Sequence, residues 1–208
     1  MEKQSKKEEL WNTLSHAVGA VLGLVGLVLL LLFNEHKTPY STFSILVYAF
    51  SLILLFSTSA IYHWVNDYRL KLLWRKMDHI GIYVLIAGTY TPVALITLEK
   101  NNGWLLFWTV WGIAGMGSIL KLFFTGRFEK LSLFLYLFMG WLIVFDIHNL
   151  VTAVSRFGLV FLILGGAFYT LGTLFYAVRK IPYNHVIWHF FVLGGAISHY
   201  IFILGAVI

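Results

Sequence analysis

The sequence predicts an all-α integral membrane protein, a bundle of seven transmembrane helices with its N-terminus in the cytoplasm and its C-terminus outside. Composition is the first observation behind this fold class. Of the 208 residues, 60% are hydrophobic and only 12% are charged, against roughly 45–50% and about 25% in soluble domains. Mean hydropathy is +0.82. A soluble particle of this size cannot bury so much apolar surface, so we expect lipid to solvate it.

Charged residues divide the chain into seven apolar stretches, which is the second observation. The stretches without Asp, Glu, Lys or Arg cover residues 10–34, 38–66, 79–98, 101–120, 131–145, 157–178 and 181–208. A membrane-spanning helix needs about 20 apolar residues, and uninterrupted apolar runs are typical of helices rather than of barrel strands. The fifth stretch has only 15 residues, so it either stands nearly upright or continues through Asp146 to Leu150. We expect one membrane domain over residues 1–208, with 1–9 as a short cytoplasmic N-terminal segment.

Basic residues predict the orientation, because loops rich in lysine and arginine stay in the cytoplasm. Only Lys37, Lys100 and Arg156 lie on the side away from the N-terminus. The other twelve of the 15 basic residues lie on the N-terminal side: Lys3, Lys6, Lys7, Arg69, Lys71, Arg75, Lys76, Lys121, Arg127, Lys130, Arg179 and Lys180. This asymmetry also accounts for the formal net charge of +6, so no nucleic acid is expected as a partner.

Polar residues gather at the predicted cytoplasmic ends of four spans. At about one membrane depth lie Glu9, Asn12 and His16 in the first span, Ser59 and His63 in the second, Asp78 and His79 in the third, and His185 and His189 in the seventh. Residues three or four apart share a helix face. Ionisable groups inside a membrane bundle are costly and mark candidate functional sites.

His63, His185 and His189 are candidate metal ligands. Two histidines four residues apart direct both imidazoles to one point, and His63 from the second span would complete a set of three. Three histidines with a fourth position open to water form a typical catalytic zinc site, in which the bound water has a pKa near 7. Asp78 is then the candidate general base or the partner of a ligand histidine, and Ser59 is a further hydrogen-bonding group.

Other interpretations of these residues stay open. A single histidine near the membrane interface also fits a solvated residue or an interhelical hydrogen bond, and imidazole suits several divalent metals besides zinc. Glu9 fits a partner of the helix dipole. His199 lies roughly 15 Å deeper than His189 along the helix, where it would hydrogen-bond within the bundle or line a cavity. Asp146 is expected in a solvated loop or cap.

At these residues the sequence resembles the hemolysin III family, the bacterial branch of the progestin and adiponectin receptor membrane proteins. The matching blocks are Glu9-x2-Asn12-x3-His16, Ser59-x3-His63 with Asp78-His-Ile-Gly81, and His185-x3-His189 followed by Ser198-His199. The resemblance implies a protein of the bacterial inner membrane with zinc on His63, His185 and His189, and with Asp78 interacting through water. The wider superfamily includes membrane-embedded ceramidases, so the resemblance also implies a role in lipid hydrolysis or lipid homeostasis.

Taken together, these observations favour a zinc-dependent hydrolase that cleaves an amide or related acyl bond of membrane lipids near the cytoplasmic leaflet. One alternative is a non-enzymatic, metal-stabilised membrane receptor or regulator. Another is a cytolysin, as the family name suggests. No span carries a regular polar stripe able to line a water-filled pore, which argues against the cytolysin. The sequence does not determine the substrate, the oligomeric state or any protein partner.

Overall fold

The computed structural model describes residues 4–178 and 180–208, so Lys3 and Arg179 from the charge comparison lie outside the described residues. Seven helices in this part of the chain are long and apolar enough to cross a membrane. They comprise α1 (Lys6–Leu32), α2 (Ser41–Trp64), α3 (Tyr68–Pro92) with η1 (Val93–Thr97), α4 (Gly103–Phe124), α5 (Glu129–Gly140) with η2 (Leu142–Asp146) and α6 (Ile147–Ala153), α7 (Arg156–Ala177), and α8 (Asn184–Phe202) with η3 (Ile203–Val207). The predicted all-α bundle of seven spans is confirmed.

Polar side chains fix the beginnings of three spans. At the start of α1, the Ser5 N–H donates to Oε2 of Glu8 at 2.7 Å, and the Glu8 N–H donates to the Ser5 hydroxyl at 3.2 Å. The side chains of Asp67 before α3 and Ser155 before α7 each accept from the main-chain N–H three residues later. These bonds satisfy amide groups that the first turn of a helix leaves without partners.

Three spans depart from a single α-helix, and the seventh does so at its end, where α8 passes into the π-helix η3. Regular α-helix ends at Pro92, which has no N–H to donate, and the next five residues form the π-helix η1. The fifth span runs from Glu129 to Ala153 as α5, the 3-10 helix η2 and α6. Its short charge-free stretch left two arrangements open, a nearly upright helix or a continuation through Asp146 to Leu150. The continuation is confirmed, since the span runs through Asp146 and beyond.

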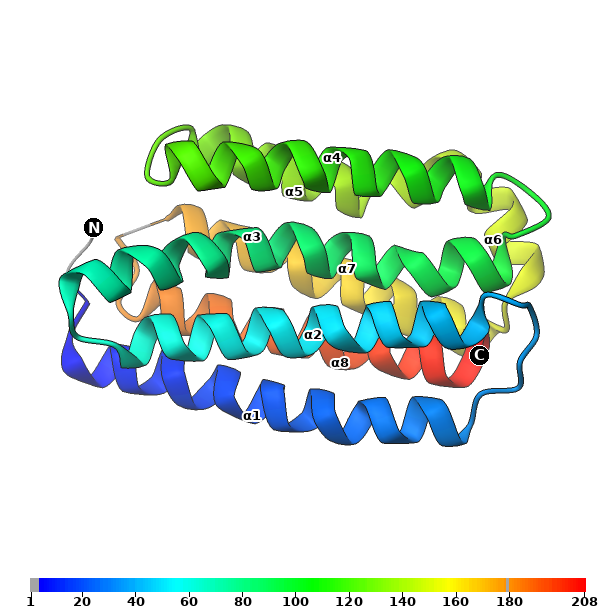
Figure 1. Cartoon of the computed structure of the whole chain (residues 1–208), viewed down its shortest axis with the longest axis horizontal. Helices are drawn as coiled ribbons and strands as arrows, with labels where there is room; N and C mark the ends of the chain where they lie inside the picture. The colour runs from blue at the N-terminus through cyan, green and yellow to red at the C-terminus, as the bar shows by residue number, and fades with distance from the viewer. Residues whose placement is uncertain (1–3, 179) are drawn as a thin grey trace.

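The spans lie side by side along the long axis of the molecule, and the two termini lie at opposite ends (Figure 1). α1 packs on α2, α2 on α3 and α3 on α4, while α5 contacts α3, α4 and α7; α7 packs on α8, and α8 returns to α1. The connections α2–α3, α4–α5 and α7–α8 lie at the end that holds the N-terminus (Figure 1). The polar groups assigned to one membrane depth therefore lie at one end of the bundle.

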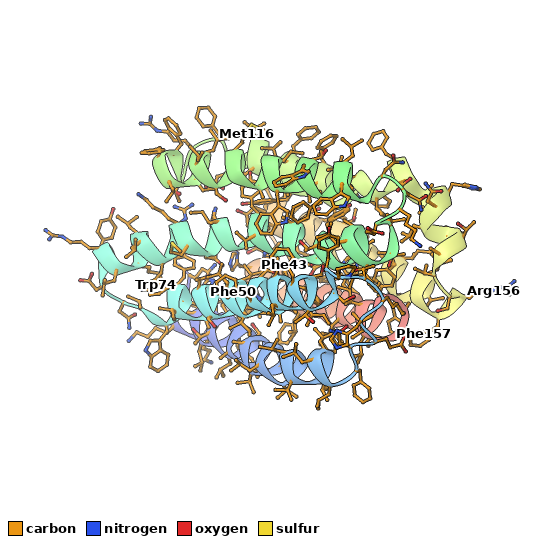
Figure 2. The ribbon with its side chains drawn as sticks, turned by 45° about the vertical axis from the view of Figure 1, so that its right-hand side comes forward. Phe43, Phe50, Trp74, Met116, Arg156 and Phe157 are labelled. Carbon is orange, nitrogen blue, oxygen red and sulfur yellow. The ribbon has the colours of Figure 1, made fainter. Side chains whose placement is uncertain are left out.

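Large apolar side chains cover the outside of the bundle (Figure 2). Phe50, Met116 and Phe157 are each more than half exposed, which would be unfavourable in water over so large a surface. Trp74 and Arg156 lie toward opposite ends of the bundle in Figure 2. The apolar outer surface fits a protein embedded in lipid.

Candidate metal centre

Three histidines from two helices meet near the N-terminal end of the bundle. His63 lies at the end of α2, and His185 and His189 lie in the first turns of α8. One ring nitrogen from each lies within 4.8 Å of the others, and the ring centroids are 4.8–5.2 Å apart. The three histidines are therefore placed to hold a metal ion, as their spacing in the sequence predicts.

The ring nitrogens in this cluster fit a metal ion. Nε2 of His63 and Nε2 of His185 are buried without a hydrogen-bond partner among residues 4–178 and 180–208. Leaving a buried polar atom unsatisfied costs about 1–3 kcal/mol, so such atoms are uncommon in folded proteins. Neutral imidazole nitrogens that converge on one point are a donor set that zinc and related divalent ions accept.

Glu9 of α1 fixes the orientation of the His63 ring. Its Oε2 lies 2.7 Å from Nδ1 of His63, and its Oε1 accepts from Nζ of Lys71 at 2.8 Å. With Nδ1–H donating to the carboxylate, the lone pair of Nε2 is left for a metal, as is usual for metal-binding histidines. Ser5 and Glu8 form the capping box of α1. Glu9 therefore has His63 and Lys71 as side-chain partners in addition to the dipole of α1.

α1 also orients His189. Nδ1 of His189 lies 3.3 Å from the main-chain oxygen of Asn12 and 3.5 Å from the hydroxyl of Ser15. A carbonyl oxygen only accepts hydrogen bonds, so Nδ1 carries the proton and Nε2 keeps the lone pair. Ser15 and Lys71 were not predictable as part of this site, because a lone serine and a basic residue between two apolar stretches give no distinctive signal in the sequence.

His16 packs directly on the three-histidine cluster. Its ring is stacked on that of His189, with centroids 3.7 Å apart and planes 16° from parallel. The sequence places Glu9, Asn12 and His16 on one face of the first span, and the structure turns this face toward the three-histidine cluster. α1 therefore contributes to the site although it supplies no member of the cluster.

Asp78 and Ser59 lie beside the three histidines. Asp78 of α3 is half-buried and lines the same cavity as Ser59 and His189. Ser59 is buried one turn before His63 on α2. The fold thus brings an acidic group and a hydroxyl group to the cluster from two helices, and their catalytic roles stay predictions.

A cavity of about 1010 Å³ opens from this site into the bundle. Ser59, Asp78 and His189 line it at the N-terminal end of the bundle, and Tyr90 and Ile147 line it toward the other end. Most of the remaining lining side chains are aliphatic or aromatic. Ligand pockets usually measure about 300–1,000 Å³, so this cavity has room for a large apolar ligand.

Two further histidines, the buried His79 and the half-buried His199, lie away from the cluster. Nδ1 of His79 is 3.7 Å from Oε2 of Glu129. Nε2 of His199 lies 3.3 Å from the main-chain oxygen of Leu162 on α7, and the His199 ring also lines the cavity. Both uses considered for His199 from the sequence therefore occur together.

Asp146 differs from the sequence-based expectation of a solvated residue. It is buried, and its Oδ1 accepts hydrogen bonds from the side-chain amides of Asn102 at 2.9 Å and Asn149 at 2.7 Å. Because the fifth span continues through η2 into α6, Asp146 lies between helices and not in a loop.

Comparison with known proteins identifies the family. The sequence matches the family model described as "Haemolysin-III related" over residues 4–200. The chain belongs to the hemolysin III family. Over 194 residues it is 40% identical to the protein named Hemolysin-3 of Bacillus cereus, which covers 93% of this chain and 89% of the relative. Over 199 residues it is 39% identical to the Hemolysin-3 homolog of Bacillus subtilis (strain 168), with 95% and 93% covered.

A more distant relative comes from animals. The chain is 29% identical over 200 residues to the human protein named Monocyte to macrophage differentiation factor, covering 93% of this chain and 82% of that protein. The resemblance drawn from the three sequence blocks is thus confirmed. Membership of the hemolysin III family and seven apolar helices together indicate a multi-pass protein of the bacterial inner membrane.

Proposed function

We propose that this hemolysin III protein is a zinc-dependent hydrolase that cleaves an amide or related acyl bond of a membrane lipid. The observation that carries the proposal is the convergence of His63, His185 and His189 at one end of a long, mainly apolar cavity. Buried imidazole nitrogens without partners favour a bound ion. A mainly apolar cavity that extends from such a site favours a lipid.

The side chains around the site support this chemistry. A zinc ion held by the three histidines would supply a Lewis acid and lower the pKa of water toward about 7. Asp78 would accept the proton of the attacking water at its carboxylate and later deliver it to the leaving group. The Ser59 hydroxyl would donate a hydrogen bond to the carbonyl oxygen, while Glu9 and the Asn12 carbonyl hold two of the histidine rings in place.

The cavity also suggests how the substrate is positioned. The proposed metal site lies at the bundle end where basic residues such as Lys71, Arg75 and Lys130 gather, and this end is the predicted cytoplasmic one. An acyl chain would extend along the apolar lining toward Tyr90, leaving its carbonyl beside Asp78. The amide or acyl bond cleaved at this depth would lie near the lipid headgroups of the cytoplasmic leaflet.

A metal-stabilised regulator is the second candidate function. An ion bound by His63 and His189 would tie α2 to α8, and ions bound at such sites contribute to folding energy. Two of the relatives bear the name Hemolysin-3, and a cytolysin is the third possibility that this name raises. Release of a dye from vesicles by the purified protein, measured against buffer alone, tests the cytolysin.

Metal content and turnover test the hydrolase. We expect about one zinc per chain by mass spectrometry of detergent-purified protein, lost in the double variant His185→Ala/His189→Ala. Asp78→Asn should keep the zinc but lose at least about a hundredfold in the rate of lipid amide cleavage. Asp67→Asn is the matched control on the same helix, because asparagine is an equally good N-cap.

Three results would contradict the hydrolase. Folded wild type that takes up no metal from added zinc would make the histidines structural. Full activity in Asp78→Asn would remove the proposed base. Zinc-loaded protein that cleaves no lipid amide or ester, and that unfolds when stripped of zinc, would favour the metal-stabilised regulator.

A further inference from the structure

His16 is a buried polar side chain in the wall of the candidate metal centre. It is 3% exposed, and neither ring nitrogen makes a hydrogen bond within the described residues. The main chain of His189 also lies near this ring, but neither ring nitrogen makes a hydrogen bond to it. The His16 ring also borders the large cavity, which places it beside the space that a ligand would occupy.

The neighbours of His16 hold its ring in place. One face stacks on His189, and Phe56 of α2 packs edge-on at a centroid distance of 5.0 Å and an angle of 85°. Gly19, one turn later on α1, leaves room for Phe56, because a Cβ there would lie 2.6 Å from its ring. The imidazole therefore cannot swing away to find another partner.

The stacking excludes His16 from the set of metal ligands. An imidazole nitrogen holds its lone pair in the plane of its ring. Because the rings of His16 and His189 are stacked 3.7 Å apart and nearly parallel, their lone pairs lie in separate planes and do not meet at one ion. His16 is nevertheless next to the ligands, where the polar end of a bound molecule would lie.

We propose that His16 binds the polar group of the ligand that occupies the cavity, at a subsite beside the metal centre. A neutral imidazole offers one donor and one acceptor, so its matching partner is an amide or carboxylic acid group with both a carbonyl oxygen and an N–H or O–H. Binding such a group would satisfy a side chain whose burial is otherwise unfavourable. The substrate class in this proposal rests on the proposed lipid amide hydrolase.

The test measures the binding of acetohydroxamate, a small molecule with a carbonyl oxygen, an N–H and an O–H, to the zinc-loaded full chain. His16→Phe keeps a flat ring for stacking but removes both nitrogens. We expect this variant to keep one zinc per chain and the wild-type Tm while its Kd for acetohydroxamate by calorimetry rises about five- to tenfold, the loss of one hydrogen bond. His16→Gln, which can donate and accept, should recover part of the affinity.

His199→Phe is the matched control, because His199 is a second histidine that lines the same cavity but lies away from the three ligands. We expect it to bind acetohydroxamate like the wild type. If the phenylalanine does not fit at position 16, His16→Met removes the same nitrogens with a flexible side chain.

Several outcomes would overturn the subsite. Unchanged affinity in a zinc-loaded His16→Phe variant would mean that water alone satisfies the histidine. Loss of zinc from that variant would make His16 a ligand or a structural support, and a zinc-loaded wild type that does not bind the probe would leave no subsite. A chain that binds acetohydroxamate through His16 but cleaves no lipid would contradict the hydrolase and support the subsite.

Discussion

Oε2 of Glu9 on α1 lies 2.7 Å from Nδ1 of His63 on α2, although 54 positions separate them in the sequence. The same carboxylate accepts from Lys71, which lies on α3. One acidic side chain therefore links three helices and sets the orientation of a candidate ligand. The first span takes part in the candidate metal centre through such contacts and contributes no histidine to the three-histidine cluster.

We expect Glu9→Gln to weaken zinc binding. Without the carboxylate, the His63 ring loses a charged acceptor at Nδ1, and losses of this kind lower metal affinity about 10–100-fold. Competition with a chelator of known affinity measures the change. Glu8→Gln is the matched control, since glutamine still completes the capping box. Equal zinc affinity in the two variants would show that the Glu9 contact does not support the metal.

Gly165→Ala should destabilise the bundle, whereas Gly166→Ala should not. A Cβ at Gly165 would collide with the ring of His199, while a Cβ at Gly166 would meet nothing within 4 Å. Overpacking costs roughly 1–3 kcal/mol, and alanine in place of an open helical glycine is neutral or favourable. Thermal unfolding in detergent should give a lower Tm for Gly165→Ala alone. Similar Tm values for both variants would mean that α7 and α8 separate easily.

Lys121→Met should lower stability more than the double variant Lys121→Met/Glu129→Gln. Lys121 is 1% exposed, and its Nζ donates to Oε2 of Glu129 at 2.9 Å. Removing one member of a buried ion pair costs roughly 3–5 kcal/mol. We expect Lys121→Met to lower the free energy of unfolding by on the order of 2 kcal/mol, because Arg75 at 3.4 Å still pairs with Glu129. A double variant that is less stable than Lys121→Met in thermal unfolding would show that Lys121 does not stabilise the bundle through its charge.

Reporter fusions should place the C-terminus outside the cytoplasm. Alkaline phosphatase fused after Ile208 should be active, since that enzyme folds only outside, and green fluorescent protein at the same position should be dark. Insertion of each reporter at Gly126, in the connection between α4 and α5, should give the reverse pattern. Active phosphatase at Gly126 would invert the orientation and move the three-histidine cluster to the outer leaflet.

The spans were predictable because lipid imposes a local requirement. Each membrane-crossing helix must be apolar over about 20 residues, and that length is visible without any tertiary contact. Hydropathy alone did not determine the length of the fifth span, because Asp146 interrupts its apolar run. In the structure, Asn102 and Asn149 satisfy one of its carboxylate oxygens, and neither contact can be read from hydropathy.

The histidine cluster was predictable for a related reason. The distribution of lysine and arginine predicted that the end of α2 and the start of α8 lie on one side of the membrane. The four-residue spacing of His185 and His189 put both on one helix face. The contacts of Glu9, Ser15 and Lys71 depend instead on how α1 and α3 rotate about their axes. That rotation is decided by packing among many side chains.

The sequence alone determined that this protein is a seven-span helical bundle and that His63, His185 and His189 share one depth, because hydropathy and basic residues act along the chain. Tertiary structure alone decided which side chains touch. It stacked His16 on His189, turned Glu9 toward His63 and left a cavity that Asp78 lines. The physical reason is that a hydrogen bond or ring contact depends on ångström-scale distances between helices, whereas membrane insertion depends on the summed hydrophobicity of about 20 residues.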